Sequence, residues 1–296
     1  MRPVRELRKI FGDIYYIPGR TNVGVVSRDD WCMIIDTGLD EDQGRRIFNV
    51  VREAGLRIKY IFNTHSHADH IGGNNIILDR AEAKVLAPSL ESYFIENPVL
   101  EPLFLYGSHP PESLKEKFLM ANPSKVDRTV IERLDEETGF RYVSLPGHSF
   151  NMYGVISDDV FFIADAIFSE NSIKKFGVIY HFNVKEAVKT LIKLEKMNFR
   201  YYVPSHFEPV SDIGSIIKVN LQSIQRVRDL IEEYTSSGIS LEELFSNILR
   251  DFNLELSPSM YFLYSSALKS YISWLIDEKI IDSKFDDGRL FLYRLR

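Results

Sequence analysis

Residues 65–70 read His-Ser-His-Ala-Asp-His and place three of the chain's seven histidines beside an aspartate. His65 and His67 are two positions apart, so in an extended segment their side chains point the same way, whereas His70 follows a bend. A polar turn would tolerate these residue types. Imidazole and carboxylate groups are also ligands of zinc, and a metal site is the more specific interpretation.

Further metal-capable side chains stand after apolar segments elsewhere in the chain. His148 follows YVSLPG, Asp165 follows VFFIA and His206 follows YYVPS, just as the first cluster follows YIFNT. Strand ends are where sites are assembled in layered sheets. A lone Gly-His-Ser would more often be an ordinary turn, but the joint arrangement predicts a metal centre. Its expected ligands are His65, His67, Asp69, His70, His148, Asp165 and His206.

Apolar patterns predict the elements that position these side chains. Alternating or continuous apolar runs predict strands at 13–19, 22–27, 31–38, 58–64, 84–88, 140–145, 154–157, 160–165 and 200–206. Helical spacing predicts helices at 41–54 and 184–198, with a short helix after Gly72-Gly73. Hairpins followed by strand–helix alternation favour α/β or α+β layers.

Two regions depart from this pattern. Residues 88–135 hold six prolines with aromatic residues between them, and we expect an inserted loop that forms a lid. From about residue 211 the pattern changes to helices at 212–235, 240–252 and 259–278, followed by a hairpin that turns at Asp287-Gly288. We expect a first domain over 1–210 and a helical, winged-helix-like unit over 211–296.

Composition argues against several classes of protein. The sequence has no 18-residue apolar run, which argues against a membrane span, and its charged start lacks the apolar block of a signal peptide. Cys32 is the only cysteine, which rules out an internal disulfide and favours a reducing, cytoplasmic setting. The net charge of −6 disfavours general affinity for nucleic acid, although a local basic groove stays compatible with it.

The ordered motifs HSHADH, LPGHS, FFIADAIF and VPSHFEPV resemble the metallo-β-lactamase superfamily over about residues 10–210. The resemblance implies an α+β fold, a four-layer αβ/βα sandwich, and two divalent metal ions. It implies a first metal bound by His65, His67 and His148, a second bound by Asp69, His70 and His206, and Asp165 as the bridge. The segment IIDTG resembles an early strand of the family, so Asp36 would orient a ligand; a plain turn aspartate is the equal alternative.

The ligand set predicts a hydrolase. Zinc suits these ligands, with iron and manganese as alternatives, because imidazole and carboxylate do not select sharply. A hydroxide held between two metals would be the nucleophile, and Asp69 is the candidate to orient it and to carry a proton to the leaving group. Asp165 stands where zinc β-lactamases commonly have cysteine, and Phe168 stands where lactonases tend to have tyrosine. Lys174 and Lys175 could hold the carboxylates of glutathione, or could be solvated charges.

We therefore predict an enzyme that hydrolyses a small thioester, lactone or other ester. A metal-dependent phosphodiesterase or ribonuclease is the alternative, disfavoured by the net charge of −3 over residues 211–296, from 10 basic and 13 acidic residues. A DNA-binding protein with structural metal is disfavoured by the second ligand set. The candidate substrate-binding residues are Phe104, Tyr106, Phe168 and His181. For Phe104 and Tyr106 the alternative is packing within the insertion or in a homodimer; for His181 it is a structural role.

Overall fold

The computed structural model describes residues 6–295, so residues 1–5 and 296 of the expected domains lie outside the described range. Its first sheet has seven strands in the spatial order β1-β2-β3-β4-β5-β6-β7, antiparallel from β1 to β4 and parallel from β4 to β7. The strands are β1 (Arg8–Phe11), β2 (Ile14–Ile17), β3 (Val23–Arg28), β4 (Trp31–Ile35), β5 (Arg57–Phe62), β6 (Lys84–Pro88) and β7 (Arg128–Val130). The strands predicted at 13–19 and 22–27 are confirmed as β2 and β3, which pair with each other.

A second sheet of four strands packs face to face with the first. Its order is β11-β10-β9-β8, with β10 and β11 parallel and the other neighbours antiparallel. The strands are β8 (Arg141–Ser144), β9 (Tyr153–Ser157), β10 (Val160–Ala164) and β11 (Tyr201–Pro204). Because side chains alternate along a strand, Met33 and Ile35 of β4 point inward and share a buried cluster with Val155 and Phe162 of the second sheet.

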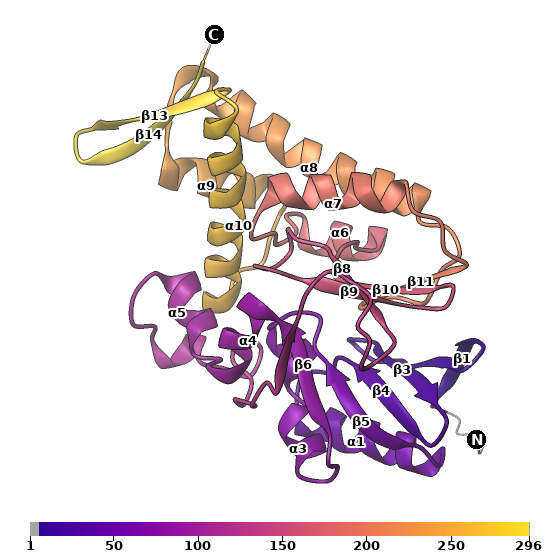
Figure 1. The fold of residues 1–296 in the computed structure, drawn as a ribbon. Coiled ribbons are helices and arrows are strands. Elements are labelled where there is room, and N and C mark those ends of the chain that lie inside the picture. The colour runs from indigo at the N-terminus through magenta and orange to yellow at the C-terminus, as the bar shows by residue number, and fades with distance from the viewer. Residues whose placement is uncertain (1–5, 296) are drawn as a thin grey trace.

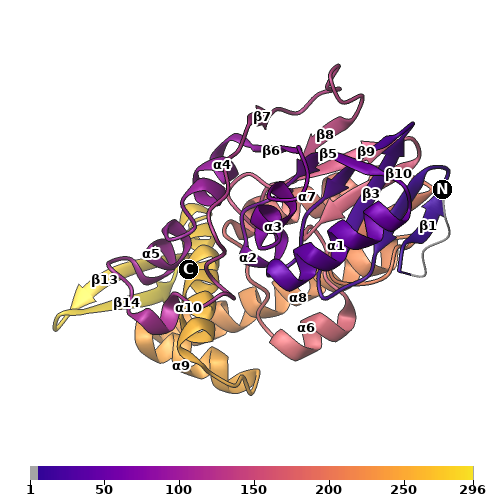
Figure 2. The same cartoon turned by 90° about the horizontal axis from the view of Figure 1, so that it is seen from below.

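Helices cover the two outer faces (Figure 1). On the first sheet, α1 (Glu41–Glu53) packs against the other face of β4, which presents Cys32 and Ile34. On the second sheet, α7 (Val184–Glu195) and α8 (Gly214–Tyr234) bury apolar side chains against β10. The shorter helices are α2 (Ala68–Ile71), α3 (Asn74–Leu78) and α6 (Glu170–Phe176). The order helix, sheet, sheet, helix in Figure 1 confirms the expected four-layer α+β sandwich. Figure 2 shows the molecule from below, with α1 and α3 in front of the strands.

The segment 88–135 is more regular than the expected loop. It contains α4 (Ser89–Glu96), α5 (Leu100–Tyr106) and the 3-10 helix η1 (Glu112–Leu114), and it ends in β7. Pro88 and Pro111 precede α4 and η1 directly, and Pro102 lies in the first turn of α5. A proline there lacks only an N–H that has no partner inside the helix. These three prolines therefore stand at the starts of helices and do not exclude them.

The C-terminal region contains the expected helices and hairpin. Its elements are η2 (Thr235–Ser237), β12 (Ile239–Ser240), α9 (Leu241–Asp251), α10 (Pro258–Asp277), β13 (Ile281–Asp286) and β14 (Arg289–Arg294). Ser240 caps α9 by accepting a hydrogen bond from the backbone N–H of Glu243, and Asp287 and Gly288 both have positive φ at the hairpin turn. Leu268 and Leu275 of α10 belong to the same buried cluster as the second sheet. The division at residue 211 thus stays a prediction, and the region shares its core with the sandwich.

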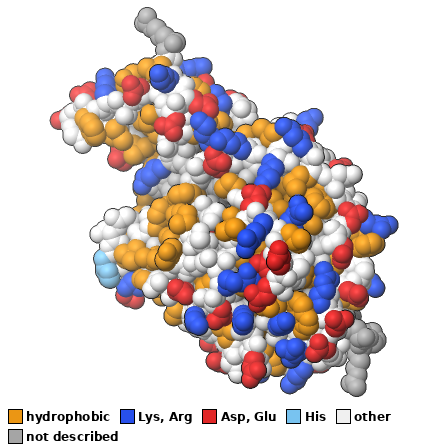
Figure 3. Space-filling view, viewed as in Figure 1, with side chains coloured by type: hydrophobic (Ala, Val, Ile, Leu, Met, Phe, Trp, Pro, Cys, Tyr) orange, Lys and Arg blue, Asp and Glu red, His pale blue; other side chains and the backbone are white. Residues whose placement is uncertain are grey.

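The surface carries charges of both signs. Figure 3 shows Lys and Arg side chains interspersed with Asp and Glu over one face of the molecule. Within residues 6–295, no helix combines the length and the apolar character that crossing a membrane requires.

Candidate metal centre

The seven predicted ligands lie together at one edge of the two sheets. The chain leaves β5 at Phe62, bends at Thr64 and His65, becomes extended at His67, and then forms α2, which carries Asp69 and His70. The other three follow β8, β10 and β11 of the second sheet. Ala164 at the end of β10 has φ of 49°, in the left-handed region, which turns the chain into Asp165.

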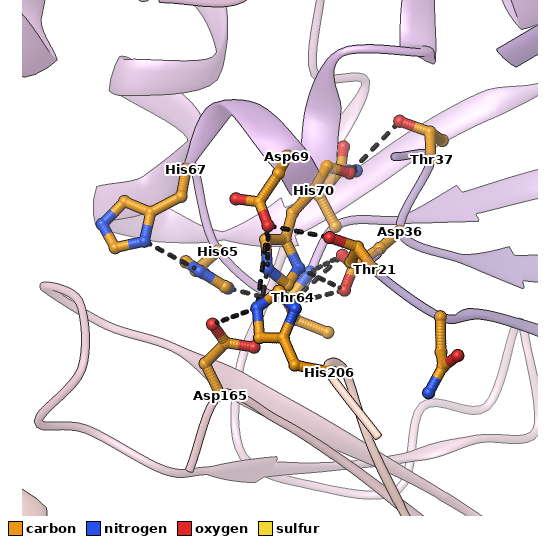
Figure 4. A network of polar contacts seen from close by, with 12 residues as sticks. Thr21, Asp36, Thr37, Thr64, His65, His67, Asp69, His70, Asp165 and His206 are labelled. Carbon is orange, nitrogen blue, oxygen red and sulfur yellow. Dashed lines mark hydrogen bonds and ion pairs between the residues drawn. The ribbon is translucent and has the colours of Figure 1, made fainter. Parts of the chain in front are cut away.

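The ligand atoms form two groups that meet at Asp165. In the first group, the Nδ1 atom of His67 lies 3.1 Å from His65 Nε2 and 3.0 Å from His148 Nε2. In the second, Asp69 Oδ2 lies 3.6 Å from the Nε2 atoms of both His70 and His206. Asp165 Oδ2 lies 3.4 Å from His148 Nε2 and 3.0 Å from His206 Nε2, so it contacts both groups. Figure 4 shows Asp69, His70, Asp165 and His206 pointing toward one another.

Partners on the far side of each ring fix how the histidines point. The Nδ1 atom of His148 lies 3.0 Å from the carbonyl oxygen of Tyr180, and that of His206 lies 2.7 Å from the carbonyl oxygen of Arg20. Both rings therefore donate outward and turn Nε2 toward the centre. His67 is reversed: its Nδ1 faces the cluster, and its Nε2 lies 4.0 Å from Oε1 of Glu101 on α5.

Asp36 stands behind two more of the histidines. Its Oδ2 lies 2.8 Å from Nδ1 of His70 and accepts from the hydroxyl of Thr64 at 2.9 Å. That hydroxyl has donated its proton to Asp36, so it accepts from Nδ1 of His65 at 3.0 Å. One buried carboxylate thus orients both rings. This geometry supports the expected orienting role of Asp36 over that of a plain turn residue.

The arrangement fits divalent cations. Within residues 6–295, His70 Nε2 and Asp165 Oδ1 are buried and have no hydrogen-bond partner. Burial lowers the pKa of His65 and of His148 well below the usual value, which keeps both rings in the neutral form that binds metal. At His206 burial opposes protonation, but Asp165 and Asp69 outweigh it and raise the pKa to about 9. The carboxylates therefore attract positive charge to this side.

Sequence reasoning missed a buried carboxylate that joins two ligand-bearing loops. Glu91 on α4 is fully buried. Its Oε2 accepts from the backbone N–H and the hydroxyl of Ser66, at 3.0 and 2.6 Å. Its Oε1 accepts from the Ser149 hydroxyl and the Asn151 N–H, both at 2.7 Å. Ser66 lies between His65 and His67, and Ser149 follows His148. The only sequence signal was Ile95, four residues on, which marks the buried face of α4.

A cavity of about 680 Å³ opens beside the cluster. It exposes five of the ligands, namely His67, Asp69, His148, Asp165 and His206. Its other walls are mostly apolar and come from the segment after η1, from α6 and the residues around it, and from α10. Phe168, a predicted substrate-binding residue, lines this cavity, and so does Lys175. Lys174 instead pairs with Glu170 on the surface at 2.6 Å.

Three predicted substrate-binding residues lie away from this cavity. Phe104 packs its ring against those of Phe150 and Phe182, and Tyr106 packs against Phe262 of α10. His181 is buried behind His148, with ring centroids 6.2 Å apart. The buried side chains of α5 are those of Glu101, Pro102 and Leu105, and of these Glu101 lines the cavity. The packing alternative is thus the better description of Phe104 and Tyr106.

Comparisons with known proteins show which family and which relatives this chain is similar to. The sequence pattern described as the metallo-beta-lactamase superfamily matches residues 16–206. A hydroxyacylglutathione hydrolase from Vibrio cholerae is 26% identical over 171 residues, which span 57% of this chain and about half of that protein, 54%. A hydroxyacylglutathione hydrolase from Wigglesworthia glossinidia brevipalpis is 24% identical over 271 residues, which cover 87% of this chain and 91% of that protein.

A solved structure extends the likeness to the C-terminal region. The crystal structure of a metallo-beta-lactamase family protein from Thermus thermophilus superposes with a TM-score of 0.74 at 18% sequence identity. The superposition covers 96% of this chain and 99% of that one. At this identity the likeness concerns the fold, and it includes the helices that follow the sandwich.

Proposed function

The chain belongs to the metallo-beta-lactamase superfamily, and from that premise we propose that it is a dinuclear metallohydrolase of a small thioester. The observation that carries the proposal is the convergence of seven imidazole and carboxylate side chains beside one cavity. Such a cavity, concave, largely apolar and with a few convergent polar groups, is typical of a small-molecule site.

We assign the ligands by the two groups seen in the structure. His65, His67 and His148 would hold one metal ion, Asp69, His70 and His206 the other, and Asp165 would contact both. Zinc is the proposed metal, with iron or manganese as alternatives. When bound, two such ions supply Lewis-acid polarisation of the scissile carbonyl and a hydroxide nucleophile at neutral pH.

Asp69 is the proposed proton carrier. Its side chain is 30% exposed and lines the cavity. The Thr21 hydroxyl donates to its Oδ2 at 2.7 Å and fixes its orientation. Burial acts to raise the pKa of Asp69, but His70 and His206 outweigh burial and lower it. Asp69 is therefore ionised at neutral pH, and it can take up a proton at Oδ1 or Oδ2 and pass it to the leaving thiol.

The choice of a thioester rests on three supports. The relatives described above are hydroxyacylglutathione hydrolases, which cleave a thioester. The cavity walls are apolar, which suits an acyl group. Arg20 and Lys175 stand exposed at the cavity and could contact an anionic thiol carrier. The same two cations would suit a phosphodiester, so that reaction remains the second candidate.

A metal assay combined with a substrate panel tests the proposal. We expect about two metal ions per folded chain, and turnover of a hydroxyacylglutathione thioester well above that of a lactone, a bis-aryl phosphodiester and RNA. Salt-sensitive turnover of RNA at a comparable rate would favour the second candidate. Folded protein that retains less than one ion after loading would refute the assignment of the site.

A point substitution tests the role of Asp69. Asp69→Asn keeps the volume but removes a ligand and the proton carrier, so we expect thioester turnover to fall by about 100-fold or more. Asp79→Asn is the matched control, because Asp79 is exposed at the end of α3. Equal turnover of the two variants would remove Asp69 from the mechanism.

We also propose a cytoplasmic location and a boundary between two structural units near residue 211. The location rests on the single cysteine of the sequence. The boundary rests on the change from strand–helix alternation to consecutive helices. A homodimer remains a proposal that size-exclusion chromatography with light scattering would test.

A further inference from the structure

The C-terminal helix α10 supplies part of the cavity wall. Met260 and Leu263 are half-buried and line the cavity, and Tyr264 lines it from the next turn. Residues 260, 263 and 264 follow the spacing of one helix face. The neighbouring Tyr261 is 43% exposed and does not line the cavity. One face of α10 is thus turned to the metal centre, although this helix lies outside the segment that matches the family.

The wall from α10 is continued by side chains of other segments. Phe118, after η1, lines the cavity and is still 48% exposed. Phe168 and Phe176, before and within α6, add two more aromatic rings. An aromatic ring that is half exposed at a cavity offers apolar area that a ligand can cover. The volume of about 680 Å³ lies in the range of cavities that hold drug-sized molecules.

One acidic side chain sits among these apolar walls apart from the metal ligands. Glu101 is 5% exposed, lines the cavity, and has an Oε2 atom without a hydrogen-bond partner within residues 6–295. Its other carboxyl oxygen, Oε1, lies 4.0 Å from Nε2 of His67. A carboxylate at the end of an acyl group would lose its hydration here, and the buried carboxyl group of Glu101 offers it no positive charge in return. An uncharged alkyl or aryl group meets no such penalty.

We propose that the cavity selects thioesters whose acyl group is apolar, uncharged and of medium length, with α10 forming the wall for that group and Glu101 rejecting acyl groups that end in a carboxylate. This inference rests on the proposed thioesterase function. It differs from that function in naming the acyl part, and in giving α10 a direct role in substrate choice.

The preference for the acyl group can be measured with thioesters of the neutral thiol N-acetylcysteamine. In these substrates no anionic thiol contributes to binding. Burial of one methylene is worth about four-fold in affinity. We therefore expect kcat/KM for the octanoyl thioester to exceed that for the butyryl thioester by about two orders of magnitude. The thioester of octanedioic acid, which has the same chain and a terminal carboxylate, should be at least about 10-fold poorer than the octanoyl compound.

Three variants connect these preferences to the named residues. Leu263→Trp should reduce the octanoyl-to-butyryl ratio to less than about 10, because the indole takes up space in the cavity. Tyr261→Ala on the same helix is the control and should keep the wild-type ratio. Glu101→Gln should raise the ratio of the octanedioic to the octanoyl thioester at least five-fold. Ratios within one variant cancel any general loss of activity.

Calorimetric titration of the metal-free protein with S-octyl-N-acetylcysteamine, a thioether that cannot be hydrolysed, separates the inference from the function. Wild-type protein should bind the thioether at least 10-fold more tightly than Leu263→Trp does. If the thioether binds in this way but no thioester is hydrolysed after metal loading, the proposed function fails and the apolar cavity stands. If thioesters are hydrolysed but neither the acyl length nor Leu263→Trp changes the ratios or the binding, the inference is overturned.

Discussion

Replacing Glu91 by glutamine should weaken metal binding more than it weakens the fold. Glu91 comes from α4, yet all four of its hydrogen bonds go to the two loops that carry His65, His67 and His148. Two of the donors are backbone N–H groups, of Ser66 and Asn151, and both face a fully buried carboxylate. The side chain therefore fixes the distance between the loops.

The magnitude follows from the donors that lose an acceptor. In Glu91→Gln one oxygen becomes an NH₂ group, so at least one backbone N–H faces a donor. A buried donor without a partner costs about 1–3 kcal/mol. Such a loss is a fraction of the roughly 5–15 kcal/mol by which a protein is stable, so the variant should fold. Loss of a partner that orients metal ligands typically costs about 10–100-fold in metal affinity.

Competition with a chromophoric chelator measures the affinity, and thermal unfolding of the metal-free protein measures the fold. Glu96→Gln is the matched control: it changes the same residue type on the same helix, where Glu96 is exposed and accepts from the Val126 N–H. We expect a 10–100-fold weaker affinity for Glu91→Gln and an unchanged affinity for Glu96→Gln. Wild-type affinity in Glu91→Gln, with only a lower melting temperature, would refute the reasoning.

Three further outcomes are expected. Burial lowers the pKa of His181 to about 4, against about 6.5 in an unfolded chain. Acidification from pH 7 to pH 5 should therefore lower the free energy of unfolding of the metal-free wild-type protein by about 2 kcal/mol more than it lowers that of the His181→Gln variant, because only the unfolded chain takes up the proton. Equal losses in the two proteins, measured by urea unfolding at both pH values, would contradict this. Cys32 is fully buried and burial raises its pKa to about 12, so it should react with a thiol reagent only after unfolding in guanidinium, as absorbance titration would reveal. Asp36 has φ of 62°, which asparagine tolerates, so Asp36→Asn should keep the fold and lose about 10–100-fold in metal affinity by chelator competition.

The clustering of the seven proposed ligands could be predicted from the sequence because each follows a recognisable apolar strand. His148, Asp165 and His206 come directly after β8, β10 and β11 or within a few residues of them, and parallel or paired strand ends meet at one edge. The residues that hold these ligands carry no such signal. Glu91 reaches partners 25 to 60 residues away in the chain, and no local spacing predicts that contact. Tertiary packing alone brings α4 against the two loops.

The segment 88–135 shows why aromatic and proline content could not decide between the two alternatives for Phe104 and Tyr106, lining the cavity or packing within the insertion. Phe104 and Tyr106 were expected at the cavity because they are apolar and flanked by Pro102 and Gly107. In the structure α5 forms, and it directs Glu101 to the cavity while Phe104 packs against Phe150 and Phe182. On a helix, residues three apart share a face only approximately. The rotation of α5 about its own axis therefore decides which of its side chains faces the cavity. The number of prolines in the segment does not reveal that rotation.

The helix α10 contributes to both stability and substrate choice, but it does so through different residues. Leu268 and Leu275 of this helix are fully buried in the cluster that also contains Phe161 and Ile163 of β10, the strand that leads into Asp165. Removing the helix would therefore expose the core beneath a metal ligand. Leu263, by contrast, is only half-buried, at the cavity end of the same helix. Leu263 packs against the smaller buried cluster of Leu105, Leu114 and Leu119, and it is not part of the cluster beneath the second sheet. Substitutions there change the wall and leave the contacts with the second sheet in place, so the helix can alter the accepted acyl group while it continues to hold that sheet.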